Sequence, residues 1–316
     1  MPPITLALLA ALCLAAAPLS YAAKARAPAR PASAPAPPTT AEVLQASSAG
    51  DWRALDASHT LLMELASGPV LIELAPRFAP RHVANILTLT RERYFDGLAV
   101  LRVQDNYVAQ WGDPDAEAAE KARPLGKAER KLPAEFDVPL RGLPLTPLAD
   151  ADGWAPVTGW VDGFPVAADP RRQRAWLAHC YGMVGAGRDN PADSSNGTEL
   201  YAVIGHSPRG LDRNITVVGR VLSGIDKLSA LPRGGNNMGF YDQPEQRHAI
   251  RSVRVLDELP PEQRPALEVL RTDTATWRAL LEARRNRREP WFVHRSGHIG
   301  LCNATVPTRP ASKPTS

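Results

Sequence analysis

The sequence predicts a mainly β protein built around a closed sheet, with few helices. Many short apolar segments are separated by turn signals, and only two or so segments in the central part of the chain have a helical pattern. Short strands in this number are typical of closed β architectures, because closure removes the exposed edges of a sheet. The chain of 316 residues is long enough for one large domain or two ordinary ones.

The first strands are predicted as a hairpin. Residues 61–65 and 70–74 are matched apolar runs, and the Ser-Gly-Pro sequence at 67–69 is a turn signal between them. A helix is expected to begin at Pro80, because proline suits the first helical turn and the apolar residues that follow share one face. Those residues are Val83, Ile86, Leu87 and Thr90.

The chain then alternates between extended segments and turns. Residues 100–110 are predicted as two extended segments around a turn at 104–106. Residues 114–175 contain Pro, Gly and Asp at short intervals, and we expect long surface loops there, with their aromatic residues Trp154, Trp160 and Phe164 packed on the body of the domain. Further strands are predicted at 177–184, 200–204, 216–221 and 248–256.

Residues 259–316 are predicted as a separate helical C-terminal extension with a Pro/Ser tail. Apolar residues with helical spacing lie within 262–288, although Asp273 and Thr274 leave two shorter helices as an alternative. We expect this apolar stripe to dock on the barrel, and a partner-binding helix is the alternative. The stripe consists of Leu267, Leu270, Trp277, Leu280 and Leu281, and the four arginines at 284, 285, 287 and 288 form the most compact basic cluster of the chain.

The N-terminus predicts export to the periplasm or secretion. Residues 1–22 contain no charged side chain, and their apolar run at 4–17 is too short for a comfortable membrane span. The small residues Ser20 and Ala22 occupy the two positions that signal peptidase reads, which predicts a cleaved signal peptide. No stable membrane span is expected after cleavage. An uncleaved anchor is the alternative. An Ala/Pro-rich linker is expected at 23–55, with a short helix near its end, before a main domain at 56–258.

Removal of the signal peptide would leave two cysteines, Cys180 and Cys302. In an oxidising compartment they can form a disulfide that ties the extension to the main domain. The sequence does not show whether their Cβ atoms meet, so this disulfide is left open. A catalytic pair of His179 and Cys180 is the other alternative, and strand geometry argues against it because neighbouring residues point to opposite faces.

Composition and motifs narrow the functional class. The net charge is +4 and the pI about 9.1, without a basic stripe interleaved with aromatic residues, so no nucleic-acid partner is predicted. The seven histidines show no zinc-like spacing with Cys or Glu, and the chain has no Gly-rich phosphate loop or G-x-S-x-G elbow. We therefore expect neither a hydrolase nor a nucleotide enzyme, and no metal or other cofactor.

Three segments occur in an informative order: YFDGLAVLRVQDNYVAQWGDP at 94–114, YGMVGAG at 181–187, and SNGTELYAVI from 195 continuing to LDRNITVVGRV at 211–221. In this order and spacing they resemble the cyclophilin family of peptidyl-prolyl cis-trans isomerases over residues 58–256, with an enlarged insertion at 114–175. The resemblance implies an eight-stranded antiparallel barrel capped by two helices, with the active site in a groove on its face.

The resemblance also implies roles for particular residues. Arg102 matches the family's catalytic arginine, and Gln110 matches the glutamine that helps to hold the substrate backbone. Leu211 matches an aliphatic wall of the proline pocket. Gly185 stands where the backbone of an asparagine normally contacts the peptide.

Several pocket positions depart from the family pattern. Tyr107 and Tyr201 stand where phenylalanines usually line the pocket, and Val108 replaces a methionine. Ile215 replaces the usual pocket histidine. The pocket stays apolar, so proline binding is expected, while the two added hydroxyl groups would either narrow the pocket or add a polar contact and so reduce activity. The remaining departures are Leu101 in place of a histidine and Gly210 at the position of a variable tryptophan.

The expected function is therefore isomerisation of X-Pro bonds in proline-containing segments of exported client proteins. The barrier of ~18–20 kcal/mol comes from amide resonance, so Arg102 would act by donating to the amide nitrogen of the twisted bond, without a nucleophile or cofactor. A chaperone or scaffold that binds proline peptides with little turnover is the first alternative. An interaction protein that works through residues 260–316 is the second.

Overall fold

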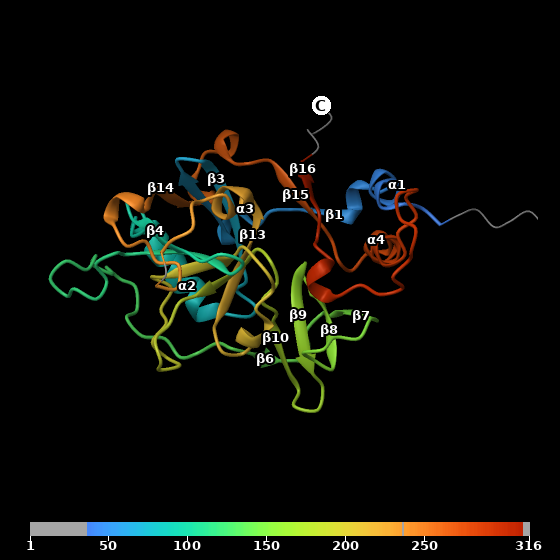
Figure 1. Ribbon diagram of the computed structural model, residues 1–316, viewed down its shortest axis with the longest axis horizontal. Coiled ribbons are helices and arrows are strands. Elements are labelled where there is room, and N and C mark those ends of the chain that lie inside the picture. The colour runs from blue at the N-terminus through green and yellow to red at the C-terminus, as the bar shows by residue number, and fades with distance from the viewer. Residues whose placement is uncertain (1–36, 236, 312–316) are drawn as a thin grey trace, which may run out of the picture. The chain divides into compact units, whose positions relative to one another are not determined.

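Eight antiparallel strands close into a barrel in the computed structural model of the protein (Figure 1). The structure describes residues 37–235 and 237–311, which belong to the unit Pro37–Ser316. The strand order is β11-β12-β5-β4-β14-β2-β3-β13, and pairing of β13 with β11 closes the barrel. The predicted fold class is confirmed, whereas the predicted signal peptide and residues 23–36 of the predicted linker lie outside the described residues.

The predicted strands of the main domain are present with one exception. Residues 177–184 were expected as a single strand, but they contain the end of β10 and the start of β11 with a turn between them, where Gly182 has a φ of 80° that glycine adopts readily. The barrel strands are β2 (Thr60–Leu65), β3 (Gly68–Leu74), β4 (Ala99–Val103), β5 (Val108–Gly112), β11 (Met183–Ala186), β12 (Leu200–Val203), β13 (Val217–Ser223) and β14 (His248–Val255).

Helix α2 (Pro80–Arg91) begins at the predicted proline, and its N-terminus is capped from a distant segment. The residue before it is Ala79, which has no side chain able to cap. The backbone N–H groups of Arg81 and His82 instead donate to the two carboxylate oxygens of Glu135, at 3.0 and 2.9 Å. The inserted segment therefore supplies the cap that the local sequence lacks.

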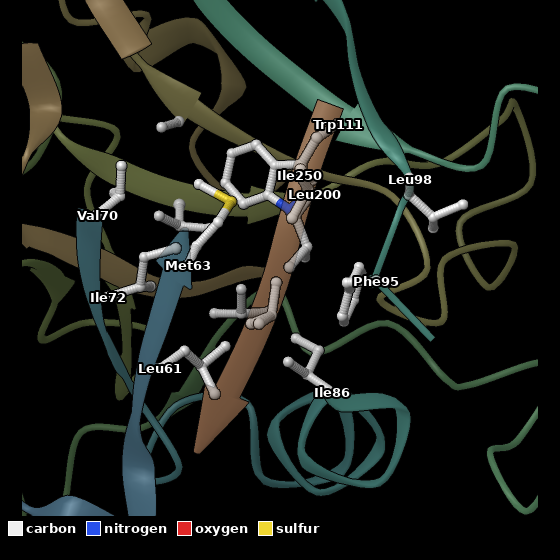
Figure 2. Close-up of a cluster of buried hydrophobic side chains, with 14 of the residues drawn as sticks. Leu61, Met63, Val70, Ile72, Ile86, Phe95, Leu98, Trp111, Leu200 and Ile250 are labelled. Carbon is white, nitrogen blue, oxygen red and sulfur yellow. The ribbon is translucent and has the colours of Figure 1, made fainter. Parts of the chain in front are cut away.

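The barrel core is filled from strands and helices together. Figure 2 shows Leu61 and Met63 of β2, Trp111 of β5 and Ile250 of β14 gathered with Ile86 of α2, and all of them are almost fully buried. A second short helix, α3 (Ile225–Ser229), adds Leu228 to the same core. Each such side chain contributes roughly 1.5–3 kcal/mol on burial, so this cluster anchors both helices on the barrel.

The inserted segment is not the set of surface loops that we expected. Its second half forms a five-stranded antiparallel sheet in the order β6-β10-β9-β8-β7. Trp160 and Phe164 are buried in it as expected, but Trp154 is 61% exposed and does not pack on the body of the domain. The strands are β6 (Val138–Pro139), β7 (Thr146–Leu148), β8 (Val157–Val161), β9 (Phe164–Asp169) and β10 (Arg174–Leu177).

The two ends of the described chain form a three-stranded sheet together. Strand β1 (Trp52–Ala54) pairs with β15 (Leu267–Leu270), which also pairs with β16 (Thr308–Pro310). Residues 52–54 are therefore part of the folded unit, and the prediction of a linker is wrong for them. The expected short helix is present as α1 (Thr40–Gln45).

The described part of the C-terminal extension, residues 259–311, contains one α-helix, α4 (Ala275–Arg285), flanked by strands. Leu267 and Leu270, which we placed on a helix, belong to β15, and α4 begins after Thr274, whose side chain caps it by accepting from the N–H of Trp277. The predicted helix is thus shorter than expected. Figure 1 shows α4 beside α1, and the two helices contact each other.

A second hydrophobic core lies between the inserted sheet and the extension. Trp160 of β8 and Trp277 of α4 meet edge to face with their ring centroids 4.9 Å apart, and both are fully buried. The helix therefore docks mainly on the inserted sheet and α1 rather than on the barrel strands. Cys180 and Cys302 also lie in this core and form a disulfide that joins residues 122 positions apart, which answers the question that the sequence left open.

Within residues 37–235 and 237–311, no helix combines the length and apolar character needed to cross a bilayer.

Candidate functional site

A cleft of about 540 Å³ opens on one face of the barrel, along β4, β5 and β12. It contains all but one of the site residues that the sequence predicted. Its lining consists of Arg102, Tyr107, Val108, Gln110, Ala116, Glu117, Gly187, Arg188, Asp189, Ser194, Asn196, Thr198, Glu199, Tyr201, Leu211, Ile215, Met238 and Phe240. The cleft therefore has an apolar part around the tyrosines and an acidic part around Glu117, Asp189 and Glu199.

Four predicted residues form one row across four neighbouring strands. Arg102 of β4 pairs with Gln110 of β5, Gln110 pairs with Tyr201 of β12, and Tyr201 pairs with Gly185 of β11. Residues that pair directly across antiparallel strands place their side chains on the same face, close enough to interact. The barrel register therefore brings together residues that lie up to 99 positions apart in the sequence.

The guanidinium of Arg102 is held in place at the wall of the cleft. Its Nε donates to the backbone oxygen of Met238 at 2.7 Å, Nη1 donates to Oε1 of Gln110 at 3.1 Å, and Nη2 donates to Oε1 of Gln104. Because a guanidinium has five N–H groups, two of them have no hydrogen-bond partner among the described residues.

Two aromatic rings contact the same guanidinium, and its burial changes its pKa. Its central carbon lies 5.6 Å from the ring centroid of Tyr107 and 5.2 Å from that of Phe240, both within the range of a cation–π contact. Burial lowers the pKa of Arg102, while Tyr107 and Glu199 act in the opposite direction. Arginine still stays charged at neutral pH, so the cleft keeps a fixed cation at its wall.

Gln110 connects this cation to a half-buried acid, Glu199. Its side-chain amide accepts from Arg102 and donates through Nε2 to Oε2 of Glu199, at 2.7 Å. Burial raises the pKa of Glu199, and the negative charges of Asp189 and Glu117 raise it further, whereas the hydrogen bond from Gln110 lowers it. The amide orientation of Gln110 is thereby set from both sides.

The apolar part of the cleft is built from predicted residues. Val108 and Tyr201 lie in a small buried cluster, and Tyr107 and Ile215 pack against it. Leu211 adds a further aliphatic wall. A prolyl ring has no N–H group and needs no polar partner, so this surface has the chemistry to hold one.

Gly185 lies behind the cleft and not among its lining residues. A Cβ atom at this position would come within 2.3 Å of the Tyr201 ring, which shows that the ring lies directly over the glycine. The structure therefore explains in steric terms why a glycine stands at position 185: the absence of a side chain makes room for the ring of Tyr201. A backbone contact of Gly185 with a peptide stays a prediction.

The hydroxyl of Tyr201 points away from the cleft into a buried polar network. It lies 2.9 Å from Nε2 of His179, whose Nδ1 lies 3.0 Å from Oδ1 of Asp212. Arg209 then donates to Asp212 at 2.6 Å and to Asp152 of the inserted segment at 3.1 Å. The network satisfies the added hydroxyl, so Tyr201 neither fills the cleft with a polar group nor leaves one unpaired.

Burial and hydrogen bonding set the charge states in this network. Burial raises the pKa of the Tyr201 hydroxyl, so it stays protonated. Burial alone would also raise the pKa of Asp212, but hydrogen bonds from His179 and Arg209, and the charge of Arg209, bring it below its ordinary value. Asp212 is therefore a carboxylate at neutral pH. His179 is occupied by this network and Cys180 by the disulfide, so the two do not form the catalytic pair considered above.

Sequence reasoning missed several residues of the site. Glu199 stands one position before β12, in a segment that carries the family resemblance. The available signal was an acid at the start of a strand that was expected beside Gln110. Phe240 carried no local signal, because it reaches Arg102 through a tertiary contact, the isolated bridge between residues 102 and 240. Gln104 stands two positions after Arg102, and side chains at this spacing share a face of an extended segment, so a local signal was available for it. In the described residues, no group of three or more His, Cys, Asp or Glu side chains is placed to hold a metal ion.

Known proteins share this barrel and its sequence pattern. The family model described as "Cyclophilin type peptidyl-prolyl cis-trans isomerase/CLD" matches residues 60–255. A Brucella suis protein named "Probable peptidyl-prolyl cis-trans isomerase" is 27% identical over 187 residues, which cover 57% of this chain and 75% of the relative. "Peptidyl-prolyl cis-trans isomerase-like 1" of Gibberella zeae is 24% identical over 198 residues, which cover 63% of this chain and 95% of that protein.

A solved structure extends the likeness beyond the barrel. The crystal structure of a cyclophilin from Hirschia baltica aligns with a TM-score of 0.67 and 25% sequence identity, and the alignment covers 83% of this chain and 95% of that one. This coverage exceeds the part matched by the family model, so it includes residues outside the barrel domain. The chain belongs to the cyclophilin-type peptidyl-prolyl cis-trans isomerase family.

Proposed function

We propose that this protein isomerises X-Pro bonds in exported client proteins, and that Arg102 stabilises the twisted amide. The observation that carries the proposal is the position of the Arg102 guanidinium, which is fixed by three hydrogen bonds beside an apolar cleft and keeps two donors without a partner among the described residues. A proline amide exchanges over ~10–100 s without a catalyst, and no covalent bond is made or broken. The protein therefore has only to bind the twisted state more tightly than either planar state.

The proposed mechanism assigns one task to each part of the cleft. Val108, Tyr201 and Leu211 hold the prolyl ring, while Gln110 orients the peptide backbone. As the carbonyl side rotates, the amide nitrogen regains a lone pair, and Arg102 donates an N–H group to it. Because this hydrogen bond is absent in the planar forms, it lowers the barrier and does not simply tighten binding.

The test is a direct isomerase assay, without a coupled protease, on an Ala-Pro test peptide. Arg102→Ala is expected to lower kcat/KM by about 10²–10³-fold, which corresponds to the loss of one well-placed donor. Arg251→Gln is the matched control, because Arg251 is exposed and has no ion pair among the described residues. Equal rates for the wild type and Arg102→Ala would contradict the mechanism.

The alternative of a proline-peptide binder with little turnover makes a different prediction. It is favoured by one observation, that Gln104, Gln110 and Met238 already engage Arg102. If those contacts persist in the complex, a peptide would bind in the cleft without a change in exchange rate. Titration of a labelled proline peptide, read beside the isomerase assay on the same sample, separates binding from turnover.

The exported location is supported by residues 1–22, whose apolar run and small residues fit a signal peptide. The proposal predicts a mature protein that begins at Ala23. Mass measurement of the protein recovered from the fraction outside the inner membrane tests this directly. Recovery of the uncut chain from the cytoplasm would contradict the proposal that the clients are exported proteins. It would not contradict the proposed isomerase activity.

A further inference from the structure

A loop at residues 286–298, here called the aromatic loop, exposes two apolar side chains, with a half-buried aromatic ring between them. Trp291 is 83% exposed and Val293 is fully exposed. Phe292 lies between them, with its ring centroid 4.9 Å from that of Trp291 and 4.5 Å from the guanidinium carbon of Arg287. Large apolar side chains gathered at one exposed position are unusual on a soluble surface, and they mark sites of interaction.

The base of the aromatic loop is fixed to the body of the protein. Asp150 of the inserted segment accepts from Nε of Arg285 at 3.0 Å and from the backbone N–H of Ile299 at 3.1 Å. Ile299 and Leu301 are buried in the second core, directly before the disulfide at Cys302. The fold thus holds both ends of the loop, and its apolar tip is presented outward by an anchored base.

The segment around the aromatic loop is basic in sequence, and part of its charge is paired, since Arg285 forms ion pairs with Asp150 and Glu282. Residues 284–298 contain five arginines and one glutamate, which gives a formal charge of +4, equal to that of all 316 residues. The rest of the chain is therefore formally neutral. Arg287 pairs with Glu289 at 3.0 Å, whereas Arg288 and Arg295 make no ion pair with any described residue.

We propose that the aromatic loop is a peripheral binding site for an anionic lipid bilayer. In this arrangement Trp291 and Val293 enter the interface between headgroups and acyl chains, where tryptophan in particular is favoured. The half-buried ring of Phe292 supports Trp291 from behind. Arg288 and Arg295 lie close to the phosphate groups, and each basic side chain near an anionic surface adds to the attraction. The site is separate from the cleft, so the inference does not depend on isomerase activity.

The size and chemistry of the loop favour a bilayer over other partners. A stable protein–protein interface buries about 800 Å² on each side, whereas one aromatic side chain supplies only about 150–250 Å². Binding to a bilayer needs no surface of complementary shape, and a few inserted side chains are enough for peripheral attachment. Single-stranded nucleic acid would use the arginines and aromatic rings, but the fully exposed aliphatic Val293 offers it no stacking surface.

Vesicle sedimentation of the full chain tests the proposal. Vesicles of equal parts phosphatidylglycerol and phosphatidylcholine are expected to bind the protein more tightly than phosphatidylcholine alone. Trp291→Ala should weaken binding to the anionic vesicles about tenfold, because one large apolar side chain leaves the interface. The double variant R288Q/R295Q should weaken it about thirtyfold, because two cations near the surface are lost.

Matched controls come from exposed residues elsewhere on the unit. Trp154→Ala removes another exposed tryptophan, and R130Q/R251Q removes two exposed arginines that have no ion pair among the described residues. Both controls should bind as the wild type does. The isomerase activity of Trp291→Ala should also stay at the wild-type level, since Trp291 does not line the cleft.

A second measurement reads insertion directly, because the apolar run at 4–17 has lipid affinity of its own in the full chain. Brominated phosphatidylglycerol quenches tryptophans that enter the bilayer. The quenched component should disappear in Trp291→Phe and persist in Trp154→Phe. Equal quenching of the wild type and Trp291→Phe would overturn the proposal. A second result would also overturn it: the wild type binds an oligonucleotide but not vesicles, and Trp291→Ala abolishes the oligonucleotide binding.

Discussion

The hydroxyl of Tyr201 lies 2.9 Å from Nε2 of His179, so a wall of the cleft is hydrogen-bonded to a buried network behind it. Through Asp212 and Arg209 this network reaches Asp152 in the inserted segment. The tyrosine thus connects the cleft to the part of the chain that enlarges this protein beyond the barrel. Four consequences of the structure can be measured.

Tyr201→Phe is expected to lower stability more than activity. The ring that faces the cleft is kept, but Nε2 of His179 loses its partner, and an unsatisfied buried polar atom costs about 1–3 kcal/mol. Urea unfolding should show this loss, while kcat/KM should change little. Tyr107→Phe is the control, because the structure shows no hydrogen bond from the Tyr107 hydroxyl to a described residue. A large fall in kcat/KM with unchanged stability would show that the hydroxyl acts on the substrate.

Gly185→Ala is expected to displace the ring of Tyr201. An added Cβ would lie 2.3 Å from the ring, so the ring or the strand must shift, and such overpacking costs roughly 1–3 kcal/mol. Because the same ring lines the cleft, we expect a higher KM for the test peptide together with a lower unfolding free energy. Gly210→Ala is the matched control, since an added Cβ there meets no atom within 4 Å. Wild-type behaviour of Gly185→Ala would mean that the ring moves at no cost.

Glu135→Gln is expected to destabilise the protein in a pH-dependent way. Burial alone would raise the pKa of Glu135, but hydrogen bonds from His82 and from the backbone N–H groups of Arg81 and His82 lower it below the ordinary 4.5. A lowered folded-state pKa stabilises the protein above the unfolded-state pKa, and this stabilisation is lost as the pH falls through the folded-state value.

At neutral pH the cost of Glu135→Gln should be about 1–2 kcal/mol, from the weakened cap and its interaction with the helix dipole. Below pH 4.5 the difference between wild type and variant should shrink towards zero in chemical denaturation. Glu129→Gln is the control, because the side chain of Glu129 makes only an exposed ion pair with Arg81, which is worth little. A pH-independent difference would exclude the ionised carboxylate as the cause.

Loss of the disulfide is expected to destabilise the unit that contains both cores. The bond between Cys180 and Cys302 closes a loop of 122 residues, and removal of a native disulfide typically costs about 2–5 kcal/mol. The double variant C180S/C302S should unfold at lower denaturant concentration, yet retain isomerase activity under native conditions because neither cysteine lines the cleft. A reducing agent should destabilise the wild type and leave the double variant unchanged. Equal midpoints for all samples would contradict this role.

Local sequence determined much of the barrel and the central row of its site. The hairpin of β2 and β3 and the start of α2 at Pro80 were correct because the turn residues, the proline and the apolar spacing act within a few residues of each other. The placement of Arg102 beside Gln110 followed from the family pattern, and the β4–β5 register pairs them.

The inserted sheet was missed although one local signal was available. Asp162 and Gly163 have φ angles of 52° and 85° between β8 and β9, and an Asp-Gly pair in such a turn is a strong hairpin signal. The strands around it are short and buried along almost their whole length, so they lack the alternation that identifies a half-buried strand. Frequent Pro and Gly then favoured a loop interpretation.

Tertiary structure alone decided how the distant parts combine. Trp52 pairs with Leu270 across more than 200 positions, Glu135 caps a helix that begins 55 residues earlier, and Phe240 reaches Arg102 from a loop. The local sequence carries propensity and period, which act over a few residues. Strand partners, helix caps and the contacts of a buried side chain depend instead on which surfaces meet when the chain closes, because an unpaired strand edge or buried polar group is satisfied by whichever segment the whole fold brings to it.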